Sequence, residues 1–278
     1  MMRVSHVGVV VILFLLSFFL SVGSVVADWH GGKALVLYSE CPYWPSCEGW
    51  VQHNYRNGTF WEKFRNEFAA QRWTVDFARH VNDSLLSNYD ALFVLTPVKD
   101  IPDDEAQAII DWVKSGGQLV ITQNGTDTYA NEITAEFGIE FDDYTLCMKI
   151  NKFASHPVTT TPYQLNKVDG ATARKIKVFG SSKKIGWCEV TFDGLTVKYC
   201  LLAVNDSAGK GVVVAIGDEW MWSYRWPSYR FNQSDNEELL DNILAYFRRT
   251  CSVPEFSTPT FLIPVFLLAV LFLFRRKG

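Results

Sequence analysis

Short, uninterrupted apolar segments alternate with helical segments along this chain, and this alternation restricts the fold more than any other feature. Residues 212–216 read VVVAI, and comparable runs occupy residues 33–38 and 91–95. A strand that is apolar on both faces needs helices on both sides, as in a parallel sheet. The order βαββαβα therefore predicts an α/β fold with a mostly parallel sheet. The other predicted strands are 73–77 and 119–122, and the predicted helices are 59–72, 102–114, 129–137 and 237–248.

The region 139–202 interrupts this pattern as a β-rich insertion or extension. Alternating polar and apolar residues flank Asp193 and Gly194, a pair that favours a tight hairpin turn. Such a hairpin would bring Cys188 and Cys200 nearly opposite each other. We therefore expect a disulfide between them.

The body of the chain has six cysteines, an even number that is compatible with disulfides in an oxidising compartment. The spacing lacks a Cys-x-x-Cys pair and a nearby histidine cluster, so it does not predict a zinc site. The expected pairs are Cys188 with Cys200, Cys41 with Cys47, and Cys147 with Cys251.

Both ends of the chain indicate export. Arg3 precedes an apolar run at 7–20 and small residues at 25 and 27, which predicts a signal peptide over residues 1–27; a retained N-terminal anchor is the alternative. An apolar run at 261–274 precedes a basic end, which should stay cytoplasmic. The body, residues 28–253, is expected outside the cell, tethered to the membrane by residues 254–278.

Glycosylation signals and charge agree with an extracytoplasmic body. The body carries 22 basic and 29 acidic residues, once Arg3, Glu255 and the bases at 275–277 are set aside. Its net charge of −7 argues against a nucleic-acid partner. Five Asn-x-Ser/Thr sequons begin at Asn57, Asn82, Asn124, Asn205 and Asn232.

The C-terminal segment begins with the tripeptide Pro254-Glu255-Phe256, followed by the apolar run and the basic end. This segment resembles the PEF-type sorting signal of archaeal cell-surface proteins (PEF-CTERM). The resemblance implies a membrane-embedded sorting enzyme of the archaeosortase type as a partner, which would exchange the segment for another anchor. A single membrane span is the alternative.

Five motifs in the body follow one another in a familiar order: PDDEAQAIIDWVKSGGQLVI at 102–121, FGI at 137–139, HPVT at 156–159, GKGVVVAIGD at 209–218 and NEELLDNI at 236–243. Together they resemble class I glutamine amidotransferase-like domains, in particular those of the DUF4350 type. The resemblance implies a flavodoxin-like α/β sandwich.

The amidotransferase chemistry is not expected to accompany that fold. The active enzymes need a cysteine on a tight Gly-x-Cys-x-Gly turn, activated by a histidine and an acid. Here the strand at 119–122 is followed by Gln123 and Asn-Gly-Thr-Asp at 124–127, and His156-Pro157 is followed by Val158 in place of glutamate. We therefore expect the cysteines to be structural, and no cofactor is implied.

A binding cleft is expected at the carboxyl ends of the parallel strands, where such folds place their ligands. The loops at 41–55, 123–128 and 217–226 should meet there, and carboxylates followed by tryptophans suit a sugar, a small molecule or an envelope protein. The competing interpretation is that the aromatic residues pack beneath the loop and Asp218 caps a turn.

Two other functions stay open: a surface hydrolase of carbohydrate or peptide that uses Asp218 or Glu219 with His53, and a scaffold subunit of an exporter or surface assembly. The candidate ligand-binding residues are Asp218, Glu219, Trp220, Asn124, Thr126 and His53.

Overall fold

The central element is a large mixed sheet with the strand order β2-β1-β3-β4-β12-β11-β10-β7. The structure is a computed structural model that describes residues 31–38, 59–95, 97, 100–123, 128–145, 147–170, 173–218, 222 and 233–251. The strands from β2 to β12 pair in parallel, and β11, β10 and β7 continue the sheet in antiparallel pairing. The protein therefore has a mixed α/β fold with a mostly parallel core.

The strands agree closely with the predicted segments. The parallel strands are β1 (Gly32–Tyr38), β2 (Trp73–Ala78), β3 (Ala91–Leu95), β4 (Gln118–Thr122) and β12 (Gly211–Ile216). The antiparallel strands of the same sheet are β11 (Leu195–Ala208), β10 (Lys183–Phe192) and β7 (Lys152–Phe153). Two small antiparallel sheets join β5 (Ile139–Thr145) to β9 (Ala173–Val178), and β6 (Lys149–Ile150) to β8 (Val168–Asp169).

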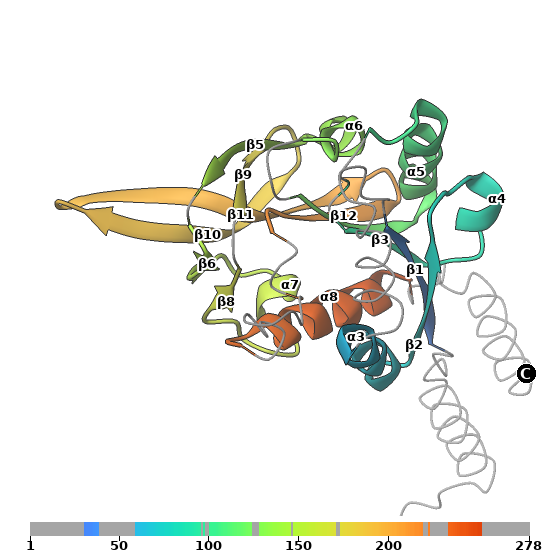
Figure 1. Cartoon of the computed structure of the whole chain (residues 1–278), viewed down its shortest axis with the longest axis horizontal. Helices are drawn as coiled ribbons and strands as arrows, with labels where there is room; N and C mark the ends of the chain where they lie inside the picture. Colours follow the sequence, from blue (N-terminus) through green and yellow to red (C-terminus); the bar gives the residue numbers. More distant parts are fainter. Residues whose placement is uncertain are drawn as a thin grey trace, which may run out of the picture.

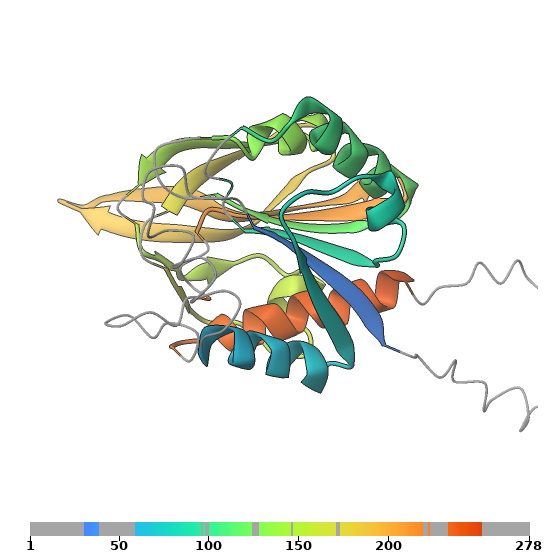
Figure 2. The ribbon, with the colours of Figure 1, turned by 45° about the vertical axis from the view of Figure 1, so that its right-hand side comes forward.

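Helices cover both faces of the large sheet (Figures 1 and 2). One face carries α3 (Thr59–Ala70), α8 (Asn236–Cys251) and α7 (Pro157–Thr160). The other carries α4 (Asp83–Leu86), α5 (Asp103–Ser115), α6 (Asn131–Thr134) and the short 3₁₀ helix η2 (Ala135–Phe137). The short helices α4 and α7 were not predicted, because a single turn leaves no apolar period to recognise.

The apolar strands fill two separate cores because successive side chains point to opposite faces. In β12, Val214 contributes to the core beneath α8, whereas its neighbours Val213 and Ala215 contribute to the core beneath α5. All three are fully buried. This explains why the sequence of such a strand is apolar at every position.

The chain enters and leaves the described body at the amino edge of the parallel strands. Gly32 begins β1 at that edge, and the Gln118 side chain at the start of β4 donates to the Phe247 carbonyl near the end of α8. Both ends lie on the same side in Figures 1 and 2. The carboxyl edge of the sheet therefore lies at the other end of the strands from the points where the described body begins and ends.

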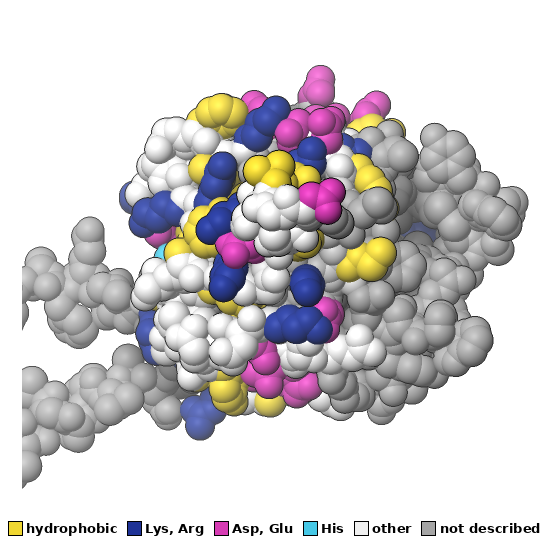
Figure 3. Space-filling view, turned by 90° about the vertical axis from the view of Figure 1, so that its left-hand side faces the viewer, with side chains coloured by type: hydrophobic (Ala, Val, Ile, Leu, Met, Phe, Trp, Pro, Cys, Tyr) yellow, Lys and Arg dark blue, Asp and Glu magenta, His cyan; other side chains and the backbone are white. Residues whose placement is uncertain are grey.

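The region 139–202 does not form a separate unit, because β10 and β11 extend the main sheet. The hairpin between them turns at Asp193 and Gly194, both with positive φ, as the sequence predicts. It projects from the body in Figure 1, and Leu195 beside its turn is 69% exposed. Viewed from that side, lysine and arginine side chains are interspersed with hydrophobic ones (Figure 3).

The predicted disulfide pairing is wrong. Cys147 is bonded to Cys188, with 6.2 Å between their Cα atoms, and Cys200 is a free, buried cysteine. The two-residue turn pairs Cys188 with Tyr199, so Cys188 and Cys200 point to opposite faces of the hairpin. This bond also excludes Cys147 with Cys251; Cys41 and Cys47 lie outside the described residues.

Candidate functional site

The carboxyl ends of β4 and β12 lie side by side, as the predicted cleft requires. Ile216 pairs with Thr122, and the Gln123 N–H donates to the Ile216 carbonyl at 3.1 Å. The loops that follow these strands therefore begin next to each other. Five of the six predicted ligand-binding residues, His53, Asn124, Thr126, Glu219 and Trp220, lie outside the described residues and stay predictions.

Asp218, the sixth predicted residue, is buried and only 3% exposed. Its carboxylate packs against Gly170, just after β8, where an added Cβ would collide with the carboxylate. A small pocket beside it is also lined by Met148 and Leu201. Asp218 is thus covered by the segment from β6 to β8. The position of Asp218 directly after an apolar strand did not predict this contact.

Trp222 is a core residue and not a surface for stacking. It is 1% exposed, its indole N–H donates to the Asn236 carbonyl at 3.2 Å, and its ring centroid lies 6.1 Å from that of Phe64. This agrees with the alternative interpretation, in which aromatic residues pack beneath the loop. Trp226 lies outside the described residues.

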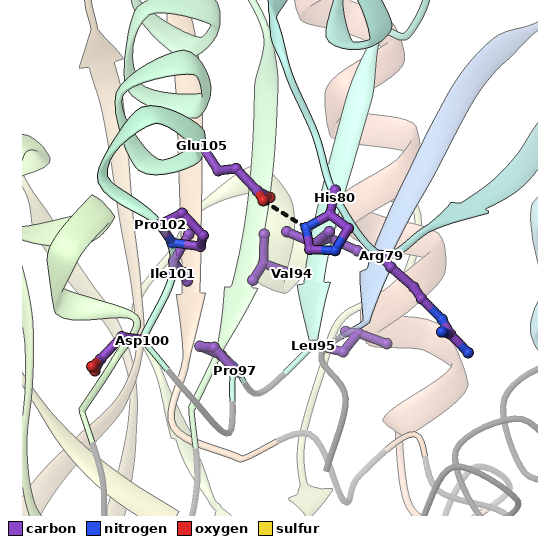
Figure 4. Close-up of a pocket in the computed structure, with 10 residues that line it drawn as sticks. Arg79, His80, Val94, Leu95, Pro97, Asp100, Ile101, Pro102 and Glu105 are labelled. Atoms are coloured by element: carbon purple, nitrogen blue, oxygen red, sulfur yellow. Dashed lines mark hydrogen bonds and ion pairs between the residues drawn. The ribbon is translucent and has the colours of Figure 1, made fainter. Parts of the chain in front are cut away.

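A second pocket lies at the carboxyl ends of β1, β2 and β3 (Figure 4). It sits beside the point where the strand order passes from β1 to β3, with β2 on the far side of β1. Chain connections diverge at such a point and leave a crevice in α/β sheets. The pocket is lined by Leu37, Arg79, His80, Val94, Leu95, Pro97, Asp100, Ile101, Pro102 and Glu105.

The polar centre of this pocket is a histidine held by a glutamate. His80 Nδ1 lies 2.7 Å from Glu105 Oε1, and the Val81 N–H donates to Glu105 Oε2 at 3.1 Å. The Glu105 side chain is 11% exposed and that of His80 is 68% exposed. The pair fixes one nitrogen of an imidazole that solvent can still reach.

Sequence analysis missed this pair because the two residues are 25 positions apart. Glu105 stands among the acids of the first turn of α5, where a carboxylate is explained by the helix dipole alone. His80 follows β2 in a bend, beyond the last residue of the apolar pattern. Only the parallel pairing of β1 with both β2 and β3 brings the two segments together.

His156 lies at the opposite edge of the sheet and has a structural role. Its Nδ1 accepts the Val158 N–H and so caps α7, while its Nε2 lies 3.2 Å from Asp206 Oδ1. Tyr246 and Lys183 also donate to the Asp206 carboxylate, at 2.6 and 2.7 Å. These hydrogen bonds, led by the one from His156, lower the pKa of Asp206, and its anionic form links α7, α8, β10 and β11.

Cys147, Cys188 and Cys200 offer no nucleophilic thiol. Cys147 and Cys188 are joined in the disulfide, and burial raises the pKa of the Cys200 thiol to about 12. The Cys200 S–H donates to the Leu202 carbonyl, so the group is both neutral and enclosed. A thiol must ionise and be reachable to attack a substrate, and Cys200 is neither ionised nor reachable.

Two of the sequons lie in the described residues, and their asparagines differ in exposure to solvent. Asn82 is exposed, and its side-chain oxygen caps α4 by accepting the Leu85 N–H at 2.9 Å. Asn205 is 4% exposed; its amide donates to the Phe137 carbonyl and its oxygen accepts the Ser207 N–H. A glycan on Asn205 is therefore incompatible with the folded structure. Asn57, Asn124 and Asn232 lie outside the described residues.

Within the described part of the chain, no three His, Cys, Asp or Glu side chains gather in a way that could hold a metal ion. No helix of that part is long and apolar enough to cross a bilayer. The predicted signal peptide and the predicted C-terminal anchor both lie outside it.

Comparison with known proteins identifies relatives of the fold alone. No family model and no curated protein matches the sequence. The mmIFT52 N-terminal domain matches with a TM-score of 0.59 at 11% identity, over 78% of this chain and 97% of that domain. A cytoplasmic protein from Salmonella typhimurium LT2 matches with a TM-score of 0.51 at 16% identity, over 77% of this chain and 99% of that protein.

A β-galactosidase from Rahnella sp. R3 also matches, with a TM-score of 0.52 at 12% identity. The match covers 81% of this chain but 32% of the β-galactosidase. At such low identity these likenesses establish a shared mixed α/β architecture and no shared chemistry.

Proposed function

We propose that this protein is a membrane-anchored, extracytoplasmic binding domain of flavodoxin-like, amidotransferase-like fold that carries out no amidotransfer. Its ligand is a glycan, another small molecule or a neighbouring envelope protein. The observation that carries the proposal is the pocket at the carboxyl ends of β1, β2 and β3. Ligands of open α/β sheets bind at that edge, beside the point where the strand order reverses.

The strand order supports the flavodoxin-like part of the proposal. The parallel strands follow the spatial order β2-β1-β3-β4-β12, which is 2-1-3-4-5 when they are numbered along the chain. That is the flavodoxin-like order, in which the ligand lies at the switch between the first and third strands. The pocket with His80 and Glu105 lies at this switch.

Amidotransfer needs a reactive cysteine and a histidine that activates it, and neither Cys200 nor His156 fits these roles. Cys200 is buried and un-ionised, and His156 is engaged with Asp206 at the amino edge, away from the end of β4. The segment that follows β4 contains no cysteine. Binding without this chemistry is therefore the favoured function.

The points where the described body begins and ends are compatible with an anchored binding domain. Both lie at the amino edge of the sheet, so the carboxyl edge with the pocket is at the opposite end of the strands. A ligand from the surroundings could then reach the pocket. The hydrolase alternative is less favoured at Asp218, whose carboxylate is buried against Gly170, and its other residues, Glu219 and His53, lie outside the described residues.

The proposal is tested on the full-length protein produced in an exporting host. Protease treatment of intact cells should degrade the body, and the purified protein should give no ammonia from glutamine above the buffer rate. A panel of glycans and metabolites should include compounds that raise its melting temperature. Protection of the body in intact cells, or measurable glutamine hydrolysis, would contradict the proposal.

A further inference from the structure

We infer that the amino edge of the sheet is a docking surface for a membrane with anionic lipid headgroups. This inference rests on the proposed membrane anchoring and adds to it the face of the body that meets the membrane and the chemistry of the lipids. It follows from three features: exposed bases at this edge, an exposed aromatic ring beside them, and the short stretch of chain between α8 and the predicted anchor.

Four exposed bases lie at the amino edge and form no ion pair with another described residue. Lys33 is at the start of β1, Arg72 directly precedes β2, and Lys210 directly precedes β12. Arg249 lies in the last turn of α8, whose end is at the same edge as the start of β1 (Figure 2). Because these strands pair in parallel, their starts share one edge, and the four bases lie on one side of the body.

The helix dipole explains only part of this charge. Both α5 and α8 begin with acids and end with bases, an arrangement that complements the dipole of each helix. Lys33 and Lys210 belong to no helix, so this rule does not require them. Two acids nearby are engaged: the Asp90 carboxylate accepts the Lys33 N–H at 2.8 Å, and Glu136 is paired with Lys114 at the end of α5. The body as a whole is acidic, so a basic edge is a local reversal of its charge.

An exposed phenylalanine lies near the same edge. Phe179 is 52% exposed, and its backbone N–H donates to the Gly138 carbonyl at 2.7 Å. Gly138 follows η2, whose Glu136 contacts Lys114 at the end of α5. Aromatic rings favour the boundary between water and hydrocarbon, where basic side chains meet lipid headgroups. An exposed aromatic ring near bases therefore suits a lipid surface.

The chain between α8 and the predicted anchor is short. α8 ends at Cys251, and the apolar run that we propose to lie in the membrane begins at Phe261. The chain between these two residues can span at most about 35 Å. This tether would keep the basic edge close to the membrane, so that even a weak attraction for each base becomes effective. A second copy of the body is a poorer occupant, because bases would face bases.

The test is lysine acetylation of the full-length protein in vesicles of phosphatidylcholine, alone or with about one third phosphatidylglycerol. An acetylating reagent that does not cross membranes modifies exposed lysines, and peptide mass spectrometry gives each rate relative to that of Lys198 on the distant hairpin. Acetylation of Lys33 and Lys210 should be at least about threefold slower in the anionic vesicles. High salt should remove the difference, because it screens the attraction between bases and headgroups.

Two double variants separate this surface from general charge. Arg72→Glu with Arg249→Glu should bring the acetylation of Lys33 and Lys210 in anionic vesicles within about twofold of that in neutral vesicles. The matched control is Lys149→Glu with Lys152→Glu, at exposed positions near the carboxyl edge, and it should leave the slower acetylation unchanged. All four replaced side chains are exposed, so both variants should keep the melting temperature of the wild type within a few degrees.

The inference is overturned if Lys33 and Lys210 react equally in both kinds of vesicle, if high salt leaves the difference, or if the two double variants behave alike. Flotation of the full-length protein with neutral vesicles in high salt tests the anchor by itself. Flotation together with equal acetylation would overturn this surface and leave the proposed anchoring standing. Failure to float would count against the anchoring, and against the inference with it.

Discussion

Asp241 on α8 is a buried acid whose replacement should stabilise the protein. It is 7% exposed, and its Oδ1 has no hydrogen-bond partner among the described residues. Burial is the largest cause that raises its pKa, to about 6 from 3.8, and the carboxylates of Glu237 and Glu238 raise it further against a hydrogen bond from Gln71. At neutral pH the folded protein therefore holds an unfavourable buried charge.

The raised pKa sets the size of the effect. A change from 3.8 to about 6 corresponds to about 3 kcal/mol in the free energy of unfolding at neutral pH. Asp241→Asn removes the charge and keeps the shape, but its amide leaves a buried donor that offsets part of the gain. The expected net stabilisation is about 1–2 kcal/mol, or roughly 2–8 °C in melting temperature for a body of this size.

The contribution of Asp241 to stability depends on pH in the opposite direction from that of most acidic residues in proteins. Because the folded-state pKa of Asp241 is the higher one, its protonated form stabilises the fold below about pH 4, and that stability is lost as the pH rises through 6. Urea unfolding should therefore show Asp241→Asn as the more stable protein at pH 7.5, and as slightly less stable than the wild type at pH 4, where only the cost of the buried amide donor remains.

The control removes the same charge from an exposed position. Asp111 lies on the outer face of α5, so Asp111→Asn should change the free energy of unfolding by less than about 0.5 kcal/mol at either pH. A gain for Asp241→Asn that persists at pH 4, or a loss at pH 7.5, would refute the reasoning.

Three further predictions concern the described body. Asp206→Asn should cost about 2–4 kcal/mol in urea unfolding at pH 7; because the folded-state pKa of Asp206 is lowered, the cost should shrink as the pH falls below about 4 and through the folded-state value. Peptide mapping without reduction should recover Cys147 linked to Cys188, and reducing that bond, which joins residues 41 positions apart, should cost about 4 kcal/mol in thermal or urea unfolding. Gly170→Ala should lower the melting temperature by an amount equal to about 1–3 kcal/mol, because its methyl group would collide with the Asp218 carboxylate; an unchanged melting temperature would contradict the burial of that carboxylate.

The sequence by itself determined the elements of the core and their class. The run VVVAI at 212–216 can be buried only between two layers of helices, and the structure places it there, with alternate residues in two cores. Local patterns were equally reliable for the turn at Asp193 and Gly194, because a two-residue hairpin depends on the residues at its centre.

Tertiary structure alone decided which distant residues meet. The hairpin was predicted, but its register was not, and a shift of one residue reverses the face of every side chain. Because Cys188 pairs with Tyr199, its side chain lies on the face where it bonds to Cys147. Asp218 was expected at an open edge, but the segment that ends at Gly170 covers it.

The pocket at His80 was also decided by the tertiary structure alone. Nothing near His80 or Glu105 in the sequence distinguishes them from a bend residue and a helix-start acid. Their contact exists because β1 pairs with β2 on one side and β3 on the other, which aligns the end of β2 with the start of α5. Apolar periodicity is a local property that a sequence displays directly, whereas a polar site at a sheet edge depends on strand order, which only long-range pairing fixes.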